Sequence, residues 1–347
     1  DALAERAAAP PYLHGGFVAA WCGAMLSEGA VRVAVARRGD GLCGVLPLAS
    51  SRAGHFTPPR YGGAGGVAES AEVARLLWRV ALAELRPRSV RVGPISRDGL
   101  GLDPVAGAAS DAHYALAPQR VEEQPVVDCD GDRETYVRGL SKNTRKHIRR
   151  RRRRMEERAT LDLDVARGAA ALGARLEEAI DIEGSGWKGA EGTAIRNSTA
   201  QLTFYRSLSE WAAGRDILEI AFLRLDGQAI AFHYNMCVHG TVYALKSGFD
   251  EAYADLAPGK VILAAEIERT FEEGRRRFHF TGQVEDYKLK WATGTERFDW
   301  ADLDAPGVGG HLTRWARAAH RRGSDFRRRR AASGVPADGL AGRRHRA

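Results

Sequence analysis

The chain has 347 residues, of which 44% are apolar, and 52 Lys plus Arg against 44 Asp plus Glu give it a formal charge of +8. This length predicts two domains or one unit built from two similar halves, and the apolar content excludes a wholly disordered or fibrous chain. No stretch of about 18 consecutive apolar residues occurs, so no membrane span is predicted.

The first third of the sequence predicts a small α/β unit. Asp40-Gly41 lies between two alternating apolar runs, which is a strong signal for a β-hairpin. An amphipathic run follows a loop rich in Gly and Pro and predicts a helix. The expected elements are helix Gly15–Leu26, strands Val31–Arg37 and Leu42–Leu48, helix 68–85 and strand Ser89–Val92.

The second half repeats this order of elements, with Asp226-Gly227 as its hairpin turn. An internal duplication explains the repetition, so we expect an α/β (α+β) fold of two tandem halves, each a mixed, mostly antiparallel sheet flanked by helices. The expected elements are helix Ser198–Ala213, strands Ile217–Leu225, Ala229–Val238 and Thr241–Gly248, helix Lys260–Glu273 and strand Arg277–Thr281.

Three segments follow from this division: a degenerate N-terminal half over residues 1–120, a catalytic half over 121–305 and an Arg-rich tail over 306–347. Residues 115–124 are the expected linker between the halves, because Pro118 and Pro125 bracket polar residues there. The tail carries an RRRR block and few large apolar residues, so we expect it to be largely disordered.

A basic helix is predicted near the start of the second half. Strand Pro125–Cys129 and helix Arg133–Leu140 precede it, and Ser141 is a suitable N-cap for the Arg-rich run that follows. Apolar side chains recur at spacings of four or seven, so one stripe can pack while the arginines point outward. The stripe consists of Tyr136, Leu140, Thr144, Ile148 and Met155.

The positive charge is concentrated in this helix and in the tail. Residues 311–347 hold eleven Arg and two Asp, a net +9, which leaves −1 for residues 1–310. Such elements suit a phosphate-rich polyanion such as tRNA or an anionic membrane surface, and a solvated charged face is the alternative. The candidate polyanion-binding residues are Arg145, Lys146, Arg149, Arg150 and Arg153.

Several catalytic signatures are absent from the sequence: there is no GxSxG elbow, no GxxxxGK[ST] loop, no HExxH and no GxGxxG after a strand. What remains is Pro258-Gly259-Lys260 at the start of a helix. A helix N-terminus attracts phosphate through its N–H groups and dipole, and Lys260 adds a charge. A simple helix cap would have the same sequence.

Two further clusters carry chemistry. Glu285, Asp286, Tyr287 and Lys288 follow a strand and suit acid/base work, although a polar loop would look the same. The Gly-rich segment 183–194 predicts a mobile loop that lines a pocket or forms a surface loop. His233 and His239 have no third ligand at metal spacing, and four scattered cysteines without a CxxC pair suit reduced cytosolic thiols. We therefore expect no metal site and a cytoplasmic protein.

In these segments the chain resembles the GNAT-like acyltransferases of the FemAB/CelD type, with the BioF2-like acetyltransferase domain. The resemblance runs from Leu140 to about Arg297. Its carriers, in family order, are Leu140-Ser141-Lys142-Asn143-Thr144-Arg145, Glu183…Trp187-Lys188-Gly189…Gly192-Thr193-Ala194, Leu225-Asp226-Gly227, Ala257-Pro258-Gly259 and Tyr287-Lys288…Trp291.

The resemblance implies two GNAT-like halves and transfer of an acyl group to a small-molecule, peptide or cell-envelope amine. An acyl-CoA donor would place its pyrophosphate at Pro258-Gly259-Lys260, beside a gap between two diverging strands. One glycine stands there instead of a run of them, and Fem-type relatives use aminoacyl-tRNA, which the arginine helix would suit. A non-catalytic polyanion-binding descendant and a peripheral membrane protein working on a lipid-linked precursor are the remaining alternatives.

The expected mechanism is direct attack by the amine, which must first lose a proton. Glu285 or Asp286 is the first candidate for the base and Glu183 the reserve. Tyr287 would protonate the leaving group, and Lys288 or backbone N–H groups from Lys246 to Phe249 would stabilise the oxyanion. The expected donor-binding residues are Lys246, Ser247, Gly248, Pro258, Gly259 and Lys260. The expected acceptor-binding residues are Trp187, Lys188, Tyr243 and Trp291.

Overall fold

A computed structural model describes residues 1–52, 54–58, 66–185, 194–282 and 284–307. The described strands form one 12-stranded sheet with helices on both faces, in the order β1-β2-β3-β5-β12-β6-β11-β10-β9-β8-β7, and β4 pairs with β2. Most neighbouring strands are antiparallel, and β3–β5 and β10–β11 are parallel. The expected mixed, mostly antiparallel α/β fold is therefore confirmed.

The N-terminal part of the sheet is covered by α3, whose start is capped by the Ser70 hydroxyl accepting from the Val73 amide. The apolar face of α3 buries Trp78 and Leu82 against β2 and β5, which is the core of this half. The elements here are α1 Ala2–Arg6, α2 Gly15–Met25, β1 Val31–Arg38, β2 Gly41–Arg52, β3 His55–Thr57, β4 Val67–Ala68, α3 Ala71–Leu85, β5 Ser89–Ser96 and α4 Asp103–Asp111.

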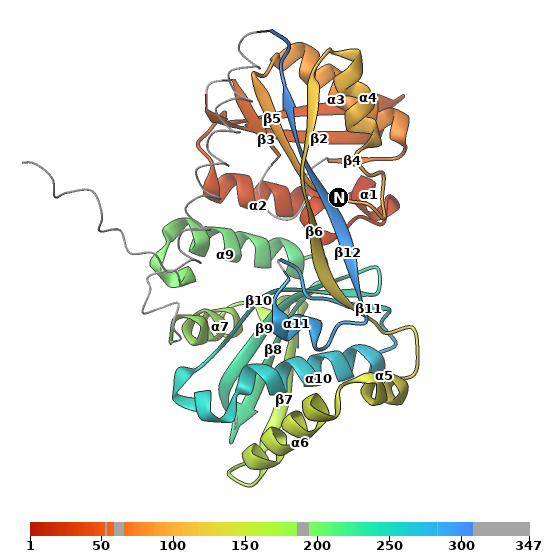
Figure 1. The fold of residues 1–347 in the computed structure, drawn as a ribbon. Helices are drawn as coiled ribbons and strands as arrows, with labels where there is room; N and C mark the ends of the chain where they lie inside the picture. The colour runs from red at the N-terminus through yellow and green to blue at the C-terminus, as the bar shows by residue number, and fades with distance from the viewer. Residues whose placement is uncertain (53, 59–65, 186–193, 283, 308–347) are drawn as a thin grey trace, which may run out of the picture.

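The C-terminal part places α7 and α9 on one face of the sheet and α5, α6 and α10 on the other (Figure 1). The first part of this half comprises β6 Ala115–Asp128, α5 Arg133–Gly139, α6 Lys142–Glu156, β7 Leu161–Arg167, α7 Ala174–Ser185 and α9 Thr199–Ala213. The second part comprises β8 Leu218–Leu225, β9 Gln228–Val238, β10 Thr241–Phe249, α10 Pro258–Glu272, β11 Arg277–His279, α11 Asp286–Leu289 and β12 Gly294–Asp304.

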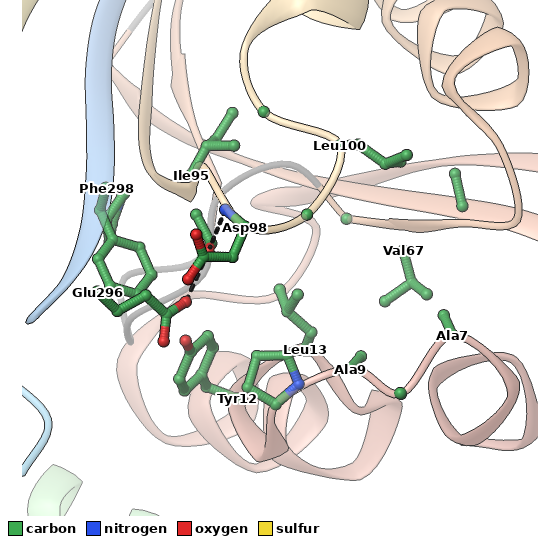
Figure 2. Close-up of a pocket in the computed structure, with 18 of the residues that line it drawn as sticks. Ala7, Ala9, Tyr12, Leu13, Val67, Ile95, Asp98, Leu100, Glu296 and Phe298 are labelled. Carbon is green, nitrogen blue, oxygen red and sulfur yellow. Dashed lines mark hydrogen bonds between the residues drawn. The ribbon is translucent and has the colours of Figure 1, made fainter. Parts of the chain in front are cut away.

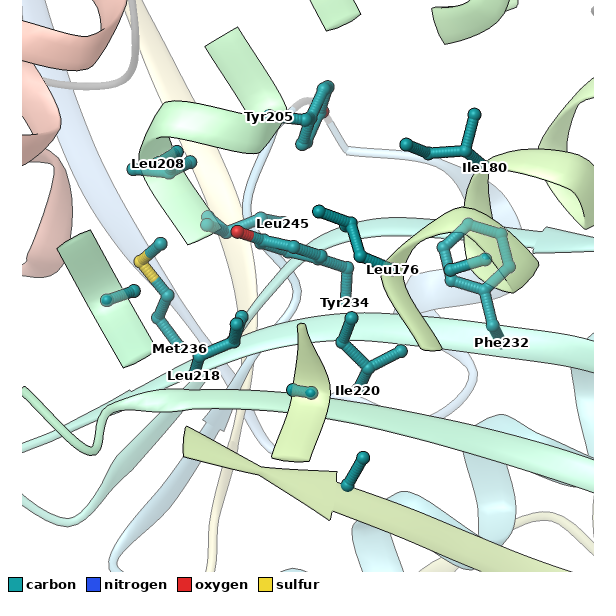
Figure 3. Close-up of a cluster of buried hydrophobic side chains, with 14 of the residues drawn as sticks. Leu176, Ile180, Tyr205, Leu208, Leu218, Ile220, Phe232, Tyr234, Met236 and Leu245 are labelled. Atoms are coloured by element: carbon teal, nitrogen blue, oxygen red, sulfur yellow. The ribbon is translucent and has the colours of Figure 1, made fainter. Parts of the chain in front are cut away.

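The larger core lies between α7, α9 and the sheet. Figure 3 shows Ile180 and Tyr205 from the helices above Ile220, Phe232 and other apolar side chains of β8 and β9. Burying a side chain of this size stabilises the fold by about 1.5–3 kcal/mol. Side chains of β9 and β10 belong to this core, and the candidate site lies at the C-terminal end of β10.

Two long strands join the halves. β12 pairs with β6 over residues 294–304 and also with β5, so a strand from the end of the chain completes the N-terminal part of the sheet (Figure 1). Residues 115–124, the expected linker, belong to β6 and bond to β12 along their length, so this segment is a paired strand. The proposed boundary at residue 120 falls inside β6, and the division into two domains stays a prediction.

The basic helix forms as its sequence predicts. The Ser141 hydroxyl accepts from the Thr144 amide at 3.0 Å and caps α6. Met155 is buried, and Ile148 and Leu140 pack against the core under α10. Residues 308–347 of the expected tail lie outside the described part of the chain. In the described part of the chain, no helix is both long and apolar enough to cross a membrane.

Candidate active site

The site begins where two parallel strands separate. β10 and β11 pair only at Thr241–Arg277, Val242–Phe278 and Tyr243–His279. β10 continues to Phe249, whereas β11 ends at His279, so the two backbone segments are no longer paired beyond this point. A cavity of about 590 Å³ occupies the region between Ala244–Phe249 on one side and Phe280–Gly282 on the other. We call it the transfer cleft.

A backbone irregularity marks the narrow end of the transfer cleft. β10 has a bulge between Ala244 and Lys246, which redirects its side chains. Across the gap, the Thr281 hydroxyl donates to the Ala244 carbonyl oxygen at 2.5 Å. Thr281 has φ +49°, and a β-branched residue in this left-handed region costs about 1–3 kcal/mol. Such strain is characteristic of functional sites, so this corner of the cleft is a candidate for one.

Glu183 forms part of one wall of the cleft. It is 2% exposed; one carboxylate oxygen lies 2.9 Å from the Lys246 ammonium and the other accepts from the Ile195 amide at 2.8 Å. The expectation that Glu183 begins a mobile loop was wrong, because it lies in the last turn of α7. Its helix packs on β9 and β10, which holds this carboxylate beside the gap.

The N-terminus of α10 forms the opposite wall. Ala257 occupies the N-cap in a left-handed conformation, φ +52°, and gives no side-chain cap to the first helical turn. Pro258 starts the 15-residue helix, and Gly259 and Lys260 line the cleft. Because Ala257, Gly259 and Lys260 line the cleft, the positive end of the α10 dipole lies at this wall, which fits a phosphate or pyrophosphate. The sequence predicted this helix start correctly.

The α11 segment contributes Lys288, which is 8% exposed. Its ammonium donates to the Thr281 carbonyl oxygen at 3.1 Å and lies 3.1 Å from a Glu285 carboxylate oxygen. Burial and the neighbouring Glu285 carboxylate raise the pKa of Tyr287 to about 12, so its hydroxyl keeps its proton at neutral pH. Glu285, Tyr287 and Lys288 line the cleft, whereas Asp286 does not.

His233 is a cleft residue that sequence reasoning did not select. It lies opposite Ser247 in the β9–β10 ladder, so both side chains share one face of the sheet. Both residues line the cleft, and His233 is only 5% exposed. Burial lowers the pKa of His233, which keeps the ring neutral at pH 7. Its place in a strand was predictable, but only the pairing with β10 shows that it reaches the cleft.

Two of the expected acceptor-binding residues, Tyr243 and Trp291, do not line the transfer cleft. Tyr243 stacks on His279 and meets Tyr12 edge-on at the side of a second cavity. Trp291 is buried against the core under α10, where the Tyr136 hydroxyl donates to its carbonyl oxygen. Trp187 and Lys188 lie outside the described residues. The placement of these four residues at the acceptor site stays a prediction.

The second cavity, of about 460 Å³, lies between the N-terminal segment, the loop after β5 and β12. Figure 2 shows Tyr12, Asp98, Glu296 and Phe298 around it, with apolar side chains over the rest of its wall. We call it the joint cavity, because both halves of the chain contribute to it. Among the residues that the structure describes, no group of His, Cys, Asp and Glu could hold a metal ion.

Comparison with known proteins identifies the class. Residues 142–289 match the acetyltransferase (GNAT) domain family, and among curated proteins no sequence matches the chain. A crystal structure of FemX is 10% identical with a TM-score of 0.58, covering 84% of this chain and 92% of that chain. The C-terminal domain of a putative lysylphosphatidylglycerol synthetase from Agrobacterium fabrum is 13% identical with a TM-score of 0.56, covering 86% and 90%.

A third similar structure is L-PGS from Bacillus licheniformis, 13% identical with a TM-score of 0.55, covering 85% of this chain and 93% of that chain. At these identities the likeness concerns the fold, which extends over both halves. By the family match, residues 142–289 form an acetyltransferase (GNAT) domain, and the chain as a whole shares the fold of these solved structures. The expected GNAT resemblance and the expected enzyme class are confirmed.

Proposed function

We propose that the protein transfers an acyl group from acyl-CoA to an amine by direct attack in the transfer cleft. The observation that carries this proposal is the position of the α10 N-terminus beside the gap between β10 and β11. A donor lying in the cleft would place its pyrophosphate on the first turn of α10, near Lys260, and its thioester toward Lys246 to Gly248 on β10.

The chemistry requires three events. The amine nitrogen forms a bond to the thioester carbonyl carbon, the carbonyl oxygen becomes an oxyanion, and the carbon–sulfur bond then breaks. Backbone N–H groups of β10 or the Lys288 ammonium would stabilise the oxyanion, and Tyr287, which holds its proton, would protonate the leaving thiolate. The cleft positions both reactants, which can by itself supply several kcal/mol.

The proton of the amine goes to a carboxylate, and Glu183 is our preferred candidate. Its buried side chain lies beside β10, whereas the Glu285 side chain is 55% exposed and pairs with Lys288. Asp286, a first candidate in the sequence analysis, lies outside the cleft lining and is now the least favoured of the three. A correctly placed general base contributes about 10²–10⁴ in rate.

Calorimetric titration with acetyl-CoA and with CoA tests the donor. We expect both to bind, and Lys260→Met to weaken binding about tenfold because it removes a charge from the phosphate site. Lys290→Met is the matched control, because this exposed lysine follows α11 outside the cleft lining. Failure of the wild-type chain to bind either compound would refute the acyl-CoA donor.

Release of free CoA in the presence of alkylamines, lysine and glucosamine tests the transfer. Glu183→Gln is expected to lower kcat about a hundredfold while the KM for acetyl-CoA changes little. Glu210→Gln, an exposed change on α9, should leave both constants unchanged. Wild-type rates in Glu183→Gln, Glu285→Gln and Asp286→Asn alike would remove the general base from the mechanism.

The second candidate is an aminoacyl-tRNA donor, and one face of α6 favours it. Five cationic residues lie along this face, at positions that recur every three or four residues, and the described residues offer no carboxylate partner to them. In contrast, Arg152 and Arg154 on the flank pair with Glu268 and Asp255. The unpaired set is Lys142, Arg145, Lys146, Arg149 and Arg150.

Binding of charged tRNA tests this candidate. If the α6 face binds phosphates, removing one cation that neutralises a phosphate lowers the slope of log affinity against log salt by about 0.7–0.9. Arg149→Gln together with Arg150→Gln should therefore reduce this slope by roughly 1.4–1.8, whereas the paired Arg152 and Arg154, changed together, should alter it less. An unchanged slope in the first variant would refute phosphate binding at this face.

A cytoplasmic location with peripheral contact to an anionic membrane is a further proposal, and the basic face of α6 supports it. Purely electrostatic attachment is expected here, because the apolar side of α6 is buried under α10 and is not available for insertion. Sedimentation with vesicles containing phosphatidylglycerol, with and without residues 311–347, separates the helix from the tail as the membrane-binding element.

A further inference from the structure

A line of polar contacts joins the N-terminal half of the chain to the narrow end of the transfer cleft. The Ser96 hydroxyl on β5 donates to one Glu296 carboxylate oxygen at 2.6 Å. The other Glu296 oxygen lies 3.3 Å from His279 Nε2. On the far side of the ring, the Thr281 amide donates to His279 Nδ1 at 3.0 Å. The line thus ends at Thr281, which follows β11 and donates its hydroxyl to the Ala244 carbonyl oxygen on β10.

These contacts fix the state of the imidazole. Because Nδ1 accepts from the Thr281 amide, a neutral ring carries its proton on Nε2, facing Glu296. The ring is 1% exposed and stacks on Tyr243 at 5.3 Å, so it does not contact a substrate in the cleft. His279 therefore has the geometry of a group that acts through its neighbours.

Thr281 is the neighbour through which it acts. This residue holds a left-handed φ of +49°, donates its hydroxyl to the Ala244 carbonyl and accepts from the Lys288 ammonium. A β-branched residue keeps such a backbone conformation only when its surroundings impose it. The hydrogen bond from the Thr281 amide to His279 Nδ1 is one of these constraints. It holds Thr281 at the narrow end of the transfer cleft and with it the carbonyl oxygen that accepts from Lys288.

The other end of the line opens on the joint cavity. Glu296 belongs to β12 and lines that cavity beside Tyr12 and Phe298 (Figure 2). Burial would raise the pKa of Glu296, but the His279 ring, the hydrogen bond from Ser96 and the charge of Arg277 together lower it, so the carboxylate is ionised at neutral pH. The anionic oxygen 3.3 Å from Nε2 attracts the Nε2 proton electrostatically, without the geometry of a hydrogen bond, and so favours this orientation of the ring.

We propose that His279 is a positioning residue for the transfer step: it holds Thr281, and through it Lys288, in the geometry that the cleft requires, and Glu296 acts only by orienting the imidazole ring. This inference rests on the proposed transferase function. It also gives the N-terminal half a role, because Ser96 on β5 donates the hydrogen bond to Glu296.

Two substitutions at one position separate the two contacts of the ring. In His279→Asn the amide oxygen lies near the former Nδ1 position and can accept from the Thr281 amide, but it does not reach Glu296. In His279→Gln the longer amide reaches Glu296 but leaves the Thr281 amide without this acceptor. Both changes remove the stacking on Tyr243, so both should lower the Tm to a similar extent.

The two variants should differ in kcat. With acetyl-CoA and the amine that the wild-type chain acetylates fastest, His279→Gln should lower kcat at least about tenfold, since small displacements of a positioning group cost up to about a hundredfold. His279→Asn should retain kcat within about threefold, and both should keep the KM for acetyl-CoA. A purely structural histidine would affect both variants alike, so equal kcat values in the two variants would overturn the proposal.

A second measurement does not depend on activity. In the wild-type chain with ¹⁵N-labelled histidine, the signal that disappears in His279→Asn should show a neutral ring protonated at Nε2 alone. Glu296→Gln should move that signal without removing it. A ring protonated at Nδ1 would refute the inference whatever the enzyme does. Absence of acyl transfer in the wild-type chain with the correct tautomer present would instead refute the proposed function.

Discussion

Glu219 offers a quantitative test of the charge cluster beneath α10. This β8 residue is 4% exposed, and its carboxylate lies 2.7 Å from the Arg269 guanidinium and also bonds to Arg275. Burial alone would raise the pKa of Glu219, but the hydrogen bonds and charges of Arg275 and Arg269 outweigh it and hold the pKa at about 2 instead of 4.5.

The size of the effect follows from this difference. A Glu219 pKa of about 2 in the folded state, against 4.5 in the unfolded state, corresponds to about 3 kcal/mol of unfolding free energy at neutral pH. Because the pKa in the folded state is lowered, this stability is present above about pH 4.5 and is lost as the pH falls toward 2. Near pH 3 about half of it should remain.

Glu219→Gln therefore costs about 3 kcal/mol at pH 7, because the buried Arg269 and the half-buried Arg275 lose the negative charge that they share. Urea unfolding at pH 7, 5 and 3 measures the difference from the wild type, which should shrink from about 3 to about 1.5 kcal/mol as the pH falls. Glu84→Gln, an exposed change on α3, is the control. A difference between Glu219→Gln and wild type that does not vary with pH would refute the argument.

Two further predictions concern the cleft wall. A Cβ at residue 248 would lie 2.7 Å from Phe232 and 3.3 Å from the Glu183 backbone, so Gly248→Ala should cost about 1–3 kcal/mol and weaken acetyl-CoA binding. Gly259→Ala, with its nearest contact at 3.4 Å, should keep the wild-type Tm, and equal Tm values in both variants would contradict this. Glu183→Gln and Lys246→Met should each lower the free energy of unfolding measured in urea. Because their side chains lie 2.9 Å apart, the loss in the double variant should differ from the sum of the two single losses by about 2 kcal/mol. A double-variant loss equal to that sum would show that the contact contributes nothing.

The site was partly predictable. The sequence located the α10 start at Pro258 and the Lys288 segment, because a Pro-Gly pair before a helical pattern and a polar cluster after a strand are local signals. It gave Glu183 a place in the cleft but the wrong secondary structure, since the glycines after it suggested that the loop began earlier. His233 and the Glu296–His279 contact had no local signal at all.

By itself the sequence determined most of the elements and the class of protein. Helix caps such as Ser141 and turns such as Asp226-Gly227 depend on neighbouring residues, so they can be read from a short window. Only the tertiary structure decided that 115–124 is a strand, because its partner β12 lies about 180 residues further along the chain. Strand pairing over that distance depends on which faces are buried together, and one sequence does not encode that locally.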